Sequence, residues 1–266
     1  MTSELARRLE LIDYEYTASR MGVLARLSGN PFQIEIRRLN AGAILMAPGL
    51  PGEPAFNRLL LFDPPALAQL EAAAKAFREK GVEFRCEVIP GHFDDSSALE
   101  LSRLGSRHTG FHTTLYAVPA GTDRAHPSQI NVVKVTEERQ MEQFMNVYLV
   151  GWGFPVEIHE GAKRNLRHWV NLPGWQLYIA SIDGIAAAVG VLFRKDGLGY
   201  LADAVTLPRY QRQGCQTALI RERVADCFAA NDELIVGQAE FGSTSQHNME
   251  RVGLSIGYTR AIWTGP

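Results

Sequence analysis

The sequence contains few cysteines and no obvious metal-binding cluster. Only three of its 266 residues are cysteine: Cys86, Cys215 and Cys227. An odd number at wide spacing fits neither a disulfide framework nor a zinc site, so we expect reduced thiols and no bound metal. His108 and His112 lie four residues apart, but no third ligand accompanies them.

The sequence also lacks an excess of charge and a long apolar run. Its 27 Lys and Arg residues nearly balance 29 Asp and Glu, for a formal net charge of −2. This balance argues against a nucleic-acid partner. No run approaches the roughly 18 apolar residues of a membrane span. Residues 1–10 are charged and lack the apolar core of a signal peptide, so we expect a cytoplasmic protein with no membrane partner.

The composition is otherwise that of a globular protein, with 46% hydrophobic and 21% charged residues. Segment 119–127 is rich in turn-forming residues and nearly empty of apolar ones, which favours a linker. We therefore predict two domains, 1–122 and 128–266.

The second half alternates short strand patterns with helical ones, which predicts an α/β fold with a mixed sheet. Thr136, followed by two glutamates, is typical of a helix start with a capping hydroxyl. The strands are expected at 129–135, 176–181, 185–193, 199–206, 234–239 and 258–264. The helices are expected at 136–151, about 160–170, 216–230 and about 245–252.

The segment 207–219 is the most informative part of the chain. A polar turn centred on Gly214 follows a strand and leads directly into a helix. The first N–H groups of a helix are unpaired and carry positive partial charge, so this arrangement favours anion binding. Arg209 and Arg212 add full positive charges, and we expect the loop to bind a phosphate group.

The same residues resemble a known family. Gln211-Arg-Gln-Gly214-Cys-Gln216 is similar to the Gln/Arg-x-x-Gly-x-Gly/Ala motif of the GNAT superfamily of N-acetyltransferases. Gln216 departs from the small residue usual at the last position. The predicted element order of residues 129–266 is also that of the GNAT (acyl-CoA N-acyltransferase) fold.

The first half carries a weaker version of the same pattern. A helix is predicted at 65–80, a strand at 82–89, a helix at 96–104 and a strand ending near 118. No glycine turn precedes the first of these helices, and Asp63 would repel a phosphate. We interpret residues 1–122 as a degenerate GNAT-like copy, in tandem with the second half, that does not bind the cofactor.

The resemblance implies that the second half binds acetyl-coenzyme A. The backbone of the strand before the loop would bind the pantetheine arm, and the loop would hold the pyrophosphate. The cofactor-binding residues expected on this basis are Ala204, Val205, Thr206, Gln211, Arg212, Gln213, Gly214, Cys215, Gln216, Thr217 and Asn248.

The catalytic residues are less evident. Many family members have a tyrosine acid four residues before a C-terminal glycine, but here that position is Met249, which has no proton to donate. Asp203 and Glu240 are the candidate bases because each lies on one of the two strands that separate around the thioester in this fold. Either carboxylate could instead bind a cationic substrate.

In this fold the first two helices and the loop between them line the acceptor pocket. Tyr148, Trp152 and Trp169 are the candidates to bind substrate there, although aromatics at helical spacing more often belong to a core.

The sequence thus predicts an acetyl-coenzyme A-dependent N-acetyltransferase that acts on a small-molecule amine or a peptide. The alternative is an inactive acyl-coenzyme A-binding sensor or interaction protein. Oligomeric state is not determined by the sequence, which leaves a homodimer open.

Overall fold

The computed structural model describes residues 2–121 and 127–265, and they form two compact units. Unit 1 comprises residues 1–114, 239–241 and 256–266, and unit 2 comprises residues 115–238 and 242–255. This division differs from the predicted halves 1–122 and 128–266, because the C-terminal strand belongs to unit 1. Much of the predicted linker, residues 122–126, lies outside the described residues.

Unit 1 contains a sheet in the strand order β1-β2-β3-β4-β11-β5. Its strands are β1 (Glu35–Arg38), β2 (Gly42–Met46), β3 (Arg58–Leu61), β4 (Phe84–Val88), β5 (Arg107–Ala117) and β11 (Ser255–Gly265). The last three residues of β5 and the first of β11 fall in unit 2. Its helices are α1 (Ser3–Ala25), α2 (Leu67–Glu79) and α3 (Asp95–Arg103). Strand β3 runs parallel to β4, and β11 pairs antiparallel with β4.

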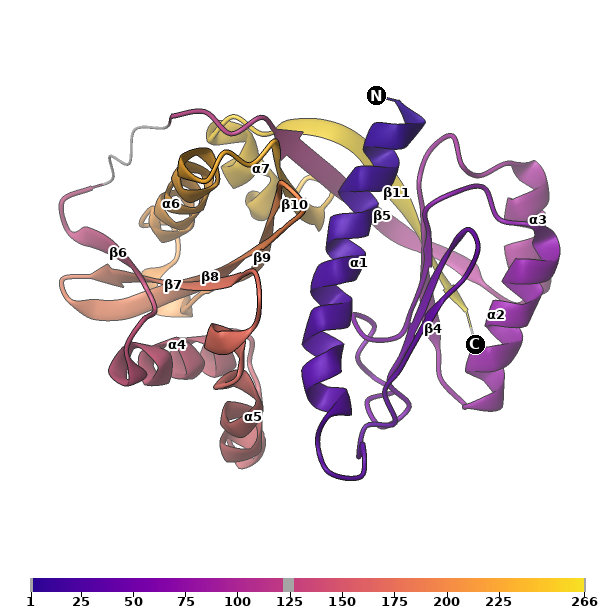
Figure 1. The fold of residues 1–266 in the computed structure, drawn as a ribbon, viewed down its shortest axis with the longest axis horizontal. Helices are drawn as coiled ribbons and strands as arrows, with labels where there is room; N and C mark the ends of the chain where they lie inside the picture. The colour runs from indigo at the N-terminus through magenta and orange to yellow at the C-terminus, as the bar shows by residue number, and fades with distance from the viewer. Residues whose placement is uncertain (1, 122–126, 266) are drawn as a thin grey trace. The chain divides into compact units, whose positions relative to one another are not determined.

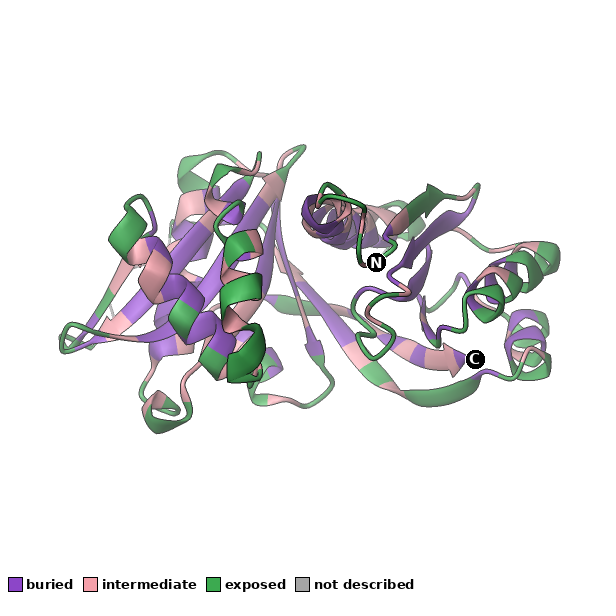
Figure 2. Ribbon diagram, turned by 90° about the horizontal axis from the view of Figure 1, so that it is seen from below, coloured by how far each residue is buried: buried purple, intermediate pink, exposed green. Residues whose placement is uncertain are grey.

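Both faces of this sheet are covered, which explains why β2 is buried along its whole length. Ile44 and Met46 pack in a core that includes Leu70 and Phe77 of α2. Ala43 and Leu45, on the opposite face of the strand, pack in a core with residues of α1. Figure 2 shows the resulting pattern, with buried strands and exposed outer faces of the helices.

Unit 2 contains strands in the order β10-β9-β8-β7-β6. Its strands are β6 (Ile130–Lys134), β7 (Trp175–Ile182), β8 (Ile185–Lys195), β9 (Leu198–Thr206) and β10 (Leu234–Glu240), whose last residues fall in unit 1. Its helices are α4 (Glu138–Gly151), α5 (His159–Leu166), α6 (Cys215–Ala229) and α7 (Thr244–Arg251), with 3-10 turns η1 (Val156–Ile158), η2 (Trp169–Asn171) and η3 (Pro208–Tyr210). Strand β10 is parallel to β9, and the other pairs are antiparallel.

Helices α4 and α6 lie on opposite sides of the unit 2 strands (Figure 1), and each contacts β7, β8 and β9. The predicted element order of the second half is confirmed. The start of α4 differs in detail, because the N-cap is Glu137 rather than Thr136. The two side chains form a capping box: the Glu137 carboxylate accepts from the N–H of Gln140, and the Gln140 side chain accepts from the N–H groups of Thr136 and Glu137. A carboxylate thus takes the role that was expected of the Thr136 hydroxyl.

The predicted helices and strand of the first half are also present, as α2, β4, α3 and β5. Helix α1 and strands β1–β3 had no counterpart in our sequence analysis. Among the residues that the structure describes, no helix is both apolar and long enough to cross a bilayer.

Candidate functional site

Strand β9 extends beyond its pairing with β10. The parallel pairing joins residues 198–201 to residues 234–237. On its other edge, β9 stays paired with β8 as far as Thr206. Residues 203–206 are only partly buried. This edge of β9 is therefore available to a ligand that pairs with backbone groups, as an extended amide chain does.

A β-bulge lies in this segment. Val191 is opposite Ala202 and Val189 is opposite Val205, so β9 holds one residue more than β8 between these pairs. Asp203, within the bulge, has a φ of +42°. A bulge re-aims backbone groups and is common next to active sites. The bulge therefore marks the end of β9 as a specialised segment.

The end of the loop after β9 and the first turn of α6, residues 212–217, have the geometry of an anion-binding site, which we call the cradle. Arg212 has a φ of +62°, and Gly214, the N-cap of α6, has a φ of +93°. Such turns gather successive backbone N–H groups on one concave surface. No side chain caps this end of α6. The helix dipole adds positive potential at the same place, so the loop suits a phosphate.

Gly214 is favoured in this loop by its backbone conformation. Its φ lies in the left-handed region that residues with a Cβ rarely adopt. A Cβ built at Gly214 would lie 3.4 Å from Cδ1 of Ile130 on β6. That distance is an ordinary contact, so the strain of a larger residue here comes from the left-handed φ.

The structure accounts for the departure at Gln216. Its side-chain nitrogen donates a hydrogen bond to the Thr206 hydroxyl, with an N–O distance of 2.9 Å. The side chain is thereby held against the end of β9, and its backbone N–H stays in the first turn of α6. Gln216 thus links the loop to β9.

The remaining predicted cofactor residues occupy distinct environments. Gln211, Arg212 and Gln213 are exposed, and the Gln213 side chain donates to the Arg209 carbonyl. Thr217 is partly buried in the first turn of α6. Asn248 lies on α7 and accepts a hydrogen bond from Arg251 at 2.6 Å. Its cofactor role remains a prediction.

Cys215 is not suited to be a nucleophile. Its side chain is buried, and burial raises the pKa of its thiol. It would contribute only backbone groups to the cradle.

The two candidate bases belong to different units. Asp203 lies in the β9 bulge of unit 2, whereas Glu240 is the exposed last residue of β10 and is assigned to unit 1. Their catalytic role also remains a prediction.

Two residues near the position of the usual acid are buried. Met249 is buried, and its sulfur occupies the space that a side chain at Gly237 would need. Tyr258 is also buried and donates a hydrogen bond to Glu10 in unit 1. Met249 and Tyr258 are therefore core residues.

The aromatic candidates for acceptor binding form one cluster. Tyr148 packs against Trp169 with a ring-centroid distance of 5.4 Å and against Trp152 at 6.4 Å. Tyr148 and Trp169 are buried, which favours a packing role for both. Trp152 is 51% exposed at the end of α4 and is the one of the three that a ligand can reach.

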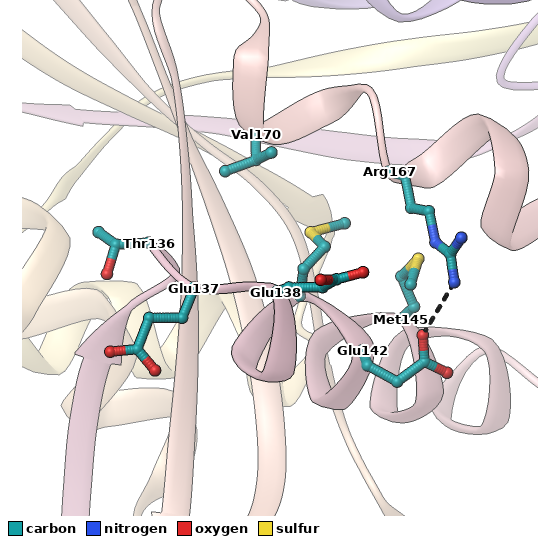
Figure 3. A pocket seen from close by; sticks show the side chains of 8 residues that line it. Thr136, Glu137, Glu138, Glu142, Met145, Arg167 and Val170 are labelled. Atoms are coloured by element: carbon teal, nitrogen blue, oxygen red, sulfur yellow. Dashed lines mark hydrogen bonds and ion pairs between the residues drawn. The ribbon is translucent and has the colours of Figure 1, made fainter.

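A cavity of about 230 Å³ lies at the other end of α4 (Figure 3). Its lining includes Glu137, Glu138 and Glu142 above an apolar surface from Met141 and Met145. Glu142 is neutralised by Lys163 at 2.6 Å and by Arg167 at 3.5 Å, as Figure 3 shows for Arg167. Gly151, which packs on Val205 of β9, lies at the opposite end of α4. The cavity is thus separate from the loop of α6.

Two residues important to this site were missed by the sequence analysis. A Cβ at Gly151 would lie 2.8 Å from a methyl group of Val205, so only glycine lets α4 approach β9 this closely. Arg223 of α6 is buried and donates to backbone carbonyls of β8 and β9. Neither residue is part of the motif, and their partners are distant in sequence. Within the described residues, no group of His, Cys, Asp and Glu could hold a metal ion.

No family model matches the sequence, and no curated protein matches it. Solved structures do match. A GCN5-related N-acetyltransferase from Kribbella flavida aligns over 95% of each chain, with a TM-score of 0.63 and 15% identity. A tandem GNAT protein from the clavulanic acid biosynthesis pathway covers 100% of this chain and 98% of its own, with a TM-score of 0.63 and 14% identity.

The chain has the GNAT fold. A Staphylococcus epidermidis protein described as functionally unknown shares it, with a TM-score of 0.65, 14% identity, and coverage of 88% of this chain and 94% of its own. The alignment with a tandem GNAT protein over the whole chain confirms the predicted pair of GNAT-like copies.

Proposed function

We propose that unit 2 binds acetyl-coenzyme A and transfers its acetyl group directly to an amine. The observation that carries this proposal is the conjunction in unit 2 of a bulged strand end and the anion cradle that follows it. Both are formed by consecutive residues, 202–217.

The corresponding segment of unit 1 supports the assignment by contrast. There, β3 leads to α2 through residues 62–66, and no residue of this connection has a positive φ. Asp63 lies in it and pairs with Arg7 at 3.3 Å. A carboxylate at this place disfavours phosphate, so we assign acetyl-coenzyme A binding to unit 2 alone.

The residues named above would have the following roles in binding and transfer. Backbone N–H groups of residues 212–217 would bind the pyrophosphate, with Arg212 beside them. Backbone groups of residues 204–206 would pair with the pantetheine arm. The bound thioester supplies an activated acetyl group. Asp203 or Glu240 would accept a proton from the incoming amine, directly or through water.

An acyl-coenzyme A-binding protein without transferase activity is the second candidate. The burial of Met249 where an acid is usual favours it. The two candidates share the cradle and differ in turnover. Release of free thiol from acetyl-coenzyme A in the presence of an amine distinguishes them.

Calorimetric titration with acetyl-coenzyme A tests the cofactor site. The Gly214→Glu variant puts a side chain and a negative charge into the cradle, so we expect binding by the wild type and none by this variant. Gly184→Glu is a matched control, because Gly184 also has a positive φ but lies in open space in a hairpin of the same unit. Equal binding by Gly214→Glu and Gly184→Glu would contradict the proposed site.

Replacement of the two carboxylates tests the chemistry. If either is the base, Asp203→Asn or Glu240→Gln should bind acetyl-coenzyme A normally but release thiol to an amine at least about a hundredfold more slowly. Wild-type rates in both variants would exclude this role for them.

A further inference from the structure

Arg223 is a buried cation that contacts the backbone at the β9 bulge. It lies in α6 and is 1% exposed. Its Nε donates to the carbonyl of Leu219 in the same helix, and its Nη1 donates to the carbonyl of Val191 on β8, both at 2.9 Å. The same Nη1 lies 3.4 Å from the carbonyl oxygen of Ala202 on β9.

A glycine on β8, Gly190, provides the space for this guanidinium. A Cβ at Gly190 would lie 3.0 Å from both Cζ and Nη1 of Arg223. Any larger residue on β8 at this point would push the guanidinium away. Gly190 is also the β8 residue opposite the bulge, between the pairs Val191–Ala202 and Val189–Val205. Arg223 therefore holds both strands where their regular pairing is interrupted.

The charge of Arg223 is not neutralised by a carboxylate. Among the described residues, no Asp or Glu side chain forms an ion pair with it. Burial lowers the pKa of its guanidinium to about 10, so the group remains charged at neutral pH. An unpaired buried charge is destabilising, and such departures from ordinary stability rules concentrate at functional sites.

The direction of the Ala202–Asp203 peptide connects this charge with the ligand side of β9. In a trans peptide the C=O and N–H point in opposite directions. The carbonyl of Ala202 faces Arg223, so the N–H of Asp203 points to the side of β9 away from β8. A cation on the carbonyl polarises the peptide and makes its N–H a stronger donor.

We propose that Arg223 is a positioning residue for acetyl transfer, which fixes the β9 bulge and strengthens the Asp203 N–H as a donor to the thioester oxygen. This inference rests on the proposed function. In the reaction, the amine nitrogen bonds to the carbonyl carbon and the C–S bond breaks; the amine loses one proton and the thiolate gains one. Negative charge develops transiently on the oxygen, where a strengthened donor stabilises it.

The test uses acetyl-coenzyme A labelled with ¹³C at its carbonyl, bound to the full-length protein. A polarised carbonyl resonates downfield of the free thioester, and we expect this shift in the wild type. Arg223→Met keeps the side-chain length but removes the charge, so its bound signal should move close to that of free acetyl-coenzyme A. Arg223→Lys keeps the charge and should give an intermediate signal.

Two further measurements separate this role from a purely structural one. Arg223→Met should lose less affinity for coenzyme A, which has no acetyl group, than for acetyl-coenzyme A. Arg221→Met removes a partly buried arginine from the same helix and should leave the carbonyl signal unchanged. If Arg223→Met does not fold, Gly190→Ala displaces the guanidinium without removing it and should move the signal in the same direction.

The outcomes are distinguishable. Binding of acetyl-coenzyme A by Arg223→Met or Gly190→Ala with a wild-type carbonyl signal would overturn the inference alone. Failure of the wild type to bind acetyl-coenzyme A would overturn the proposed function and the inference with it.

Discussion

At the scale of single residues, unit 1 is organised around a buried ionic cluster of Glu10, Asp13, Arg58, Glu87 and Arg260. Arg260 lies 2.7 Å from Glu10 and also pairs with Glu87, and Arg58 pairs with Asp13 and Glu87. All five side chains are almost completely buried. Removing one partner from such a cluster leaves an uncompensated buried charge, which is strongly destabilising.

The carboxylates of this cluster should differ in their contribution to stability. Arg260, Arg58 and Arg85 hold the pKa of Glu87 well below its usual range despite burial, whereas burial raises the pKa of Glu10. We expect Glu87→Gln to lower the free energy of unfolding by about 3–5 kcal/mol at neutral pH. Glu10→Gln should lower it less, because the raised pKa of Glu10 means that the cost of burying its charge outweighs its ion pairs. Denaturant titrations measure both.

The pH dependence of these variants follows from the same shifts. Because the folded pKa of Glu87 is lowered, its stabilisation is present above the ordinary carboxyl value of 4.5 and is lost as the pH falls below it. The raised pKa of Glu10 acts in the opposite direction. Wild-type stability should therefore fall more steeply with acid than that of Glu87→Gln. Parallel curves would contradict the assigned role of Glu87.

The three cysteines provide a second residue-scale prediction. All are free and buried, and burial raises the pKa of each thiol. The folded protein should react slowly with a thiol reagent such as Ellman's reagent, and denaturant should release all three groups. Rapid labelling of Cys215 in the native state would show that the start of α6 opens readily.

At the scale of elements, the approach of α4 to β9 depends on Gly151. A Cβ at this position would lie 2.8 and 2.9 Å from the two γ-methyl groups of Val205. Gly151→Ala should destabilise the protein by about 1–3 kcal/mol through overpacking. It should also weaken acetyl-coenzyme A binding, because Val205 lies in the strand end proposed to bind the pantetheine arm. Gly161→Ala on α5, where no close contact would arise, is the control.

Sequence patterns predicted the elements of unit 2 well because local signals mark them. Gly214 stands at the start of α6, and Asp183 and Gly184 form the turn between β7 and β8. Helix α1 escaped notice because its buried face includes Glu10, Asp13 and Thr17, so it lacks a simple apolar stripe. Their partners lie on β3, β4 and β11, too distant in sequence for local periodicity to reveal.

The candidate site was likewise predictable only where a local motif marks it. The cradle follows from a contiguous motif, and the structure has the expected turn and helix start there. The bulge at Asp203 depends on register with β8, and Arg223 depends on the space at Gly190. Both are consequences of pairing between strands, which composition and spacing do not determine.

At the scale of the whole molecule, β11 joins the end of the described chain to the sheet of unit 1. It pairs with β4, from Ala261 opposite Val88 to Gly265 opposite Phe84. Arg260 on β11 supplies the cation that faces Glu10 and Glu87. The core of unit 1 thus depends on residues that follow all of unit 2 in sequence.

Removal of this cation should affect unit 1 more than unit 2. In Arg260→Met, we expect hydrogen exchange to quicken most in α1 and β4, because each carries a carboxylate that pairs with Arg260. Amides of β7 and β8 should keep their protection. Uniform loss of protection throughout the chain would show instead that the two units unfold together.

The placement of β11 has a consequence for how the protein is made. During synthesis, α1 and β4 leave the ribosome long before Tyr258 and Arg260, which complete their sheet. Until then, β4 has an unfilled edge, and Glu10 and Glu87 each lack the partner that Arg260 provides, so the nascent chain is exposed to mispairing. Most of unit 1 is synthesised before unit 2 but its sheet is completed after it, and this interval is where a ribosome-associated chaperone would have most effect on yield.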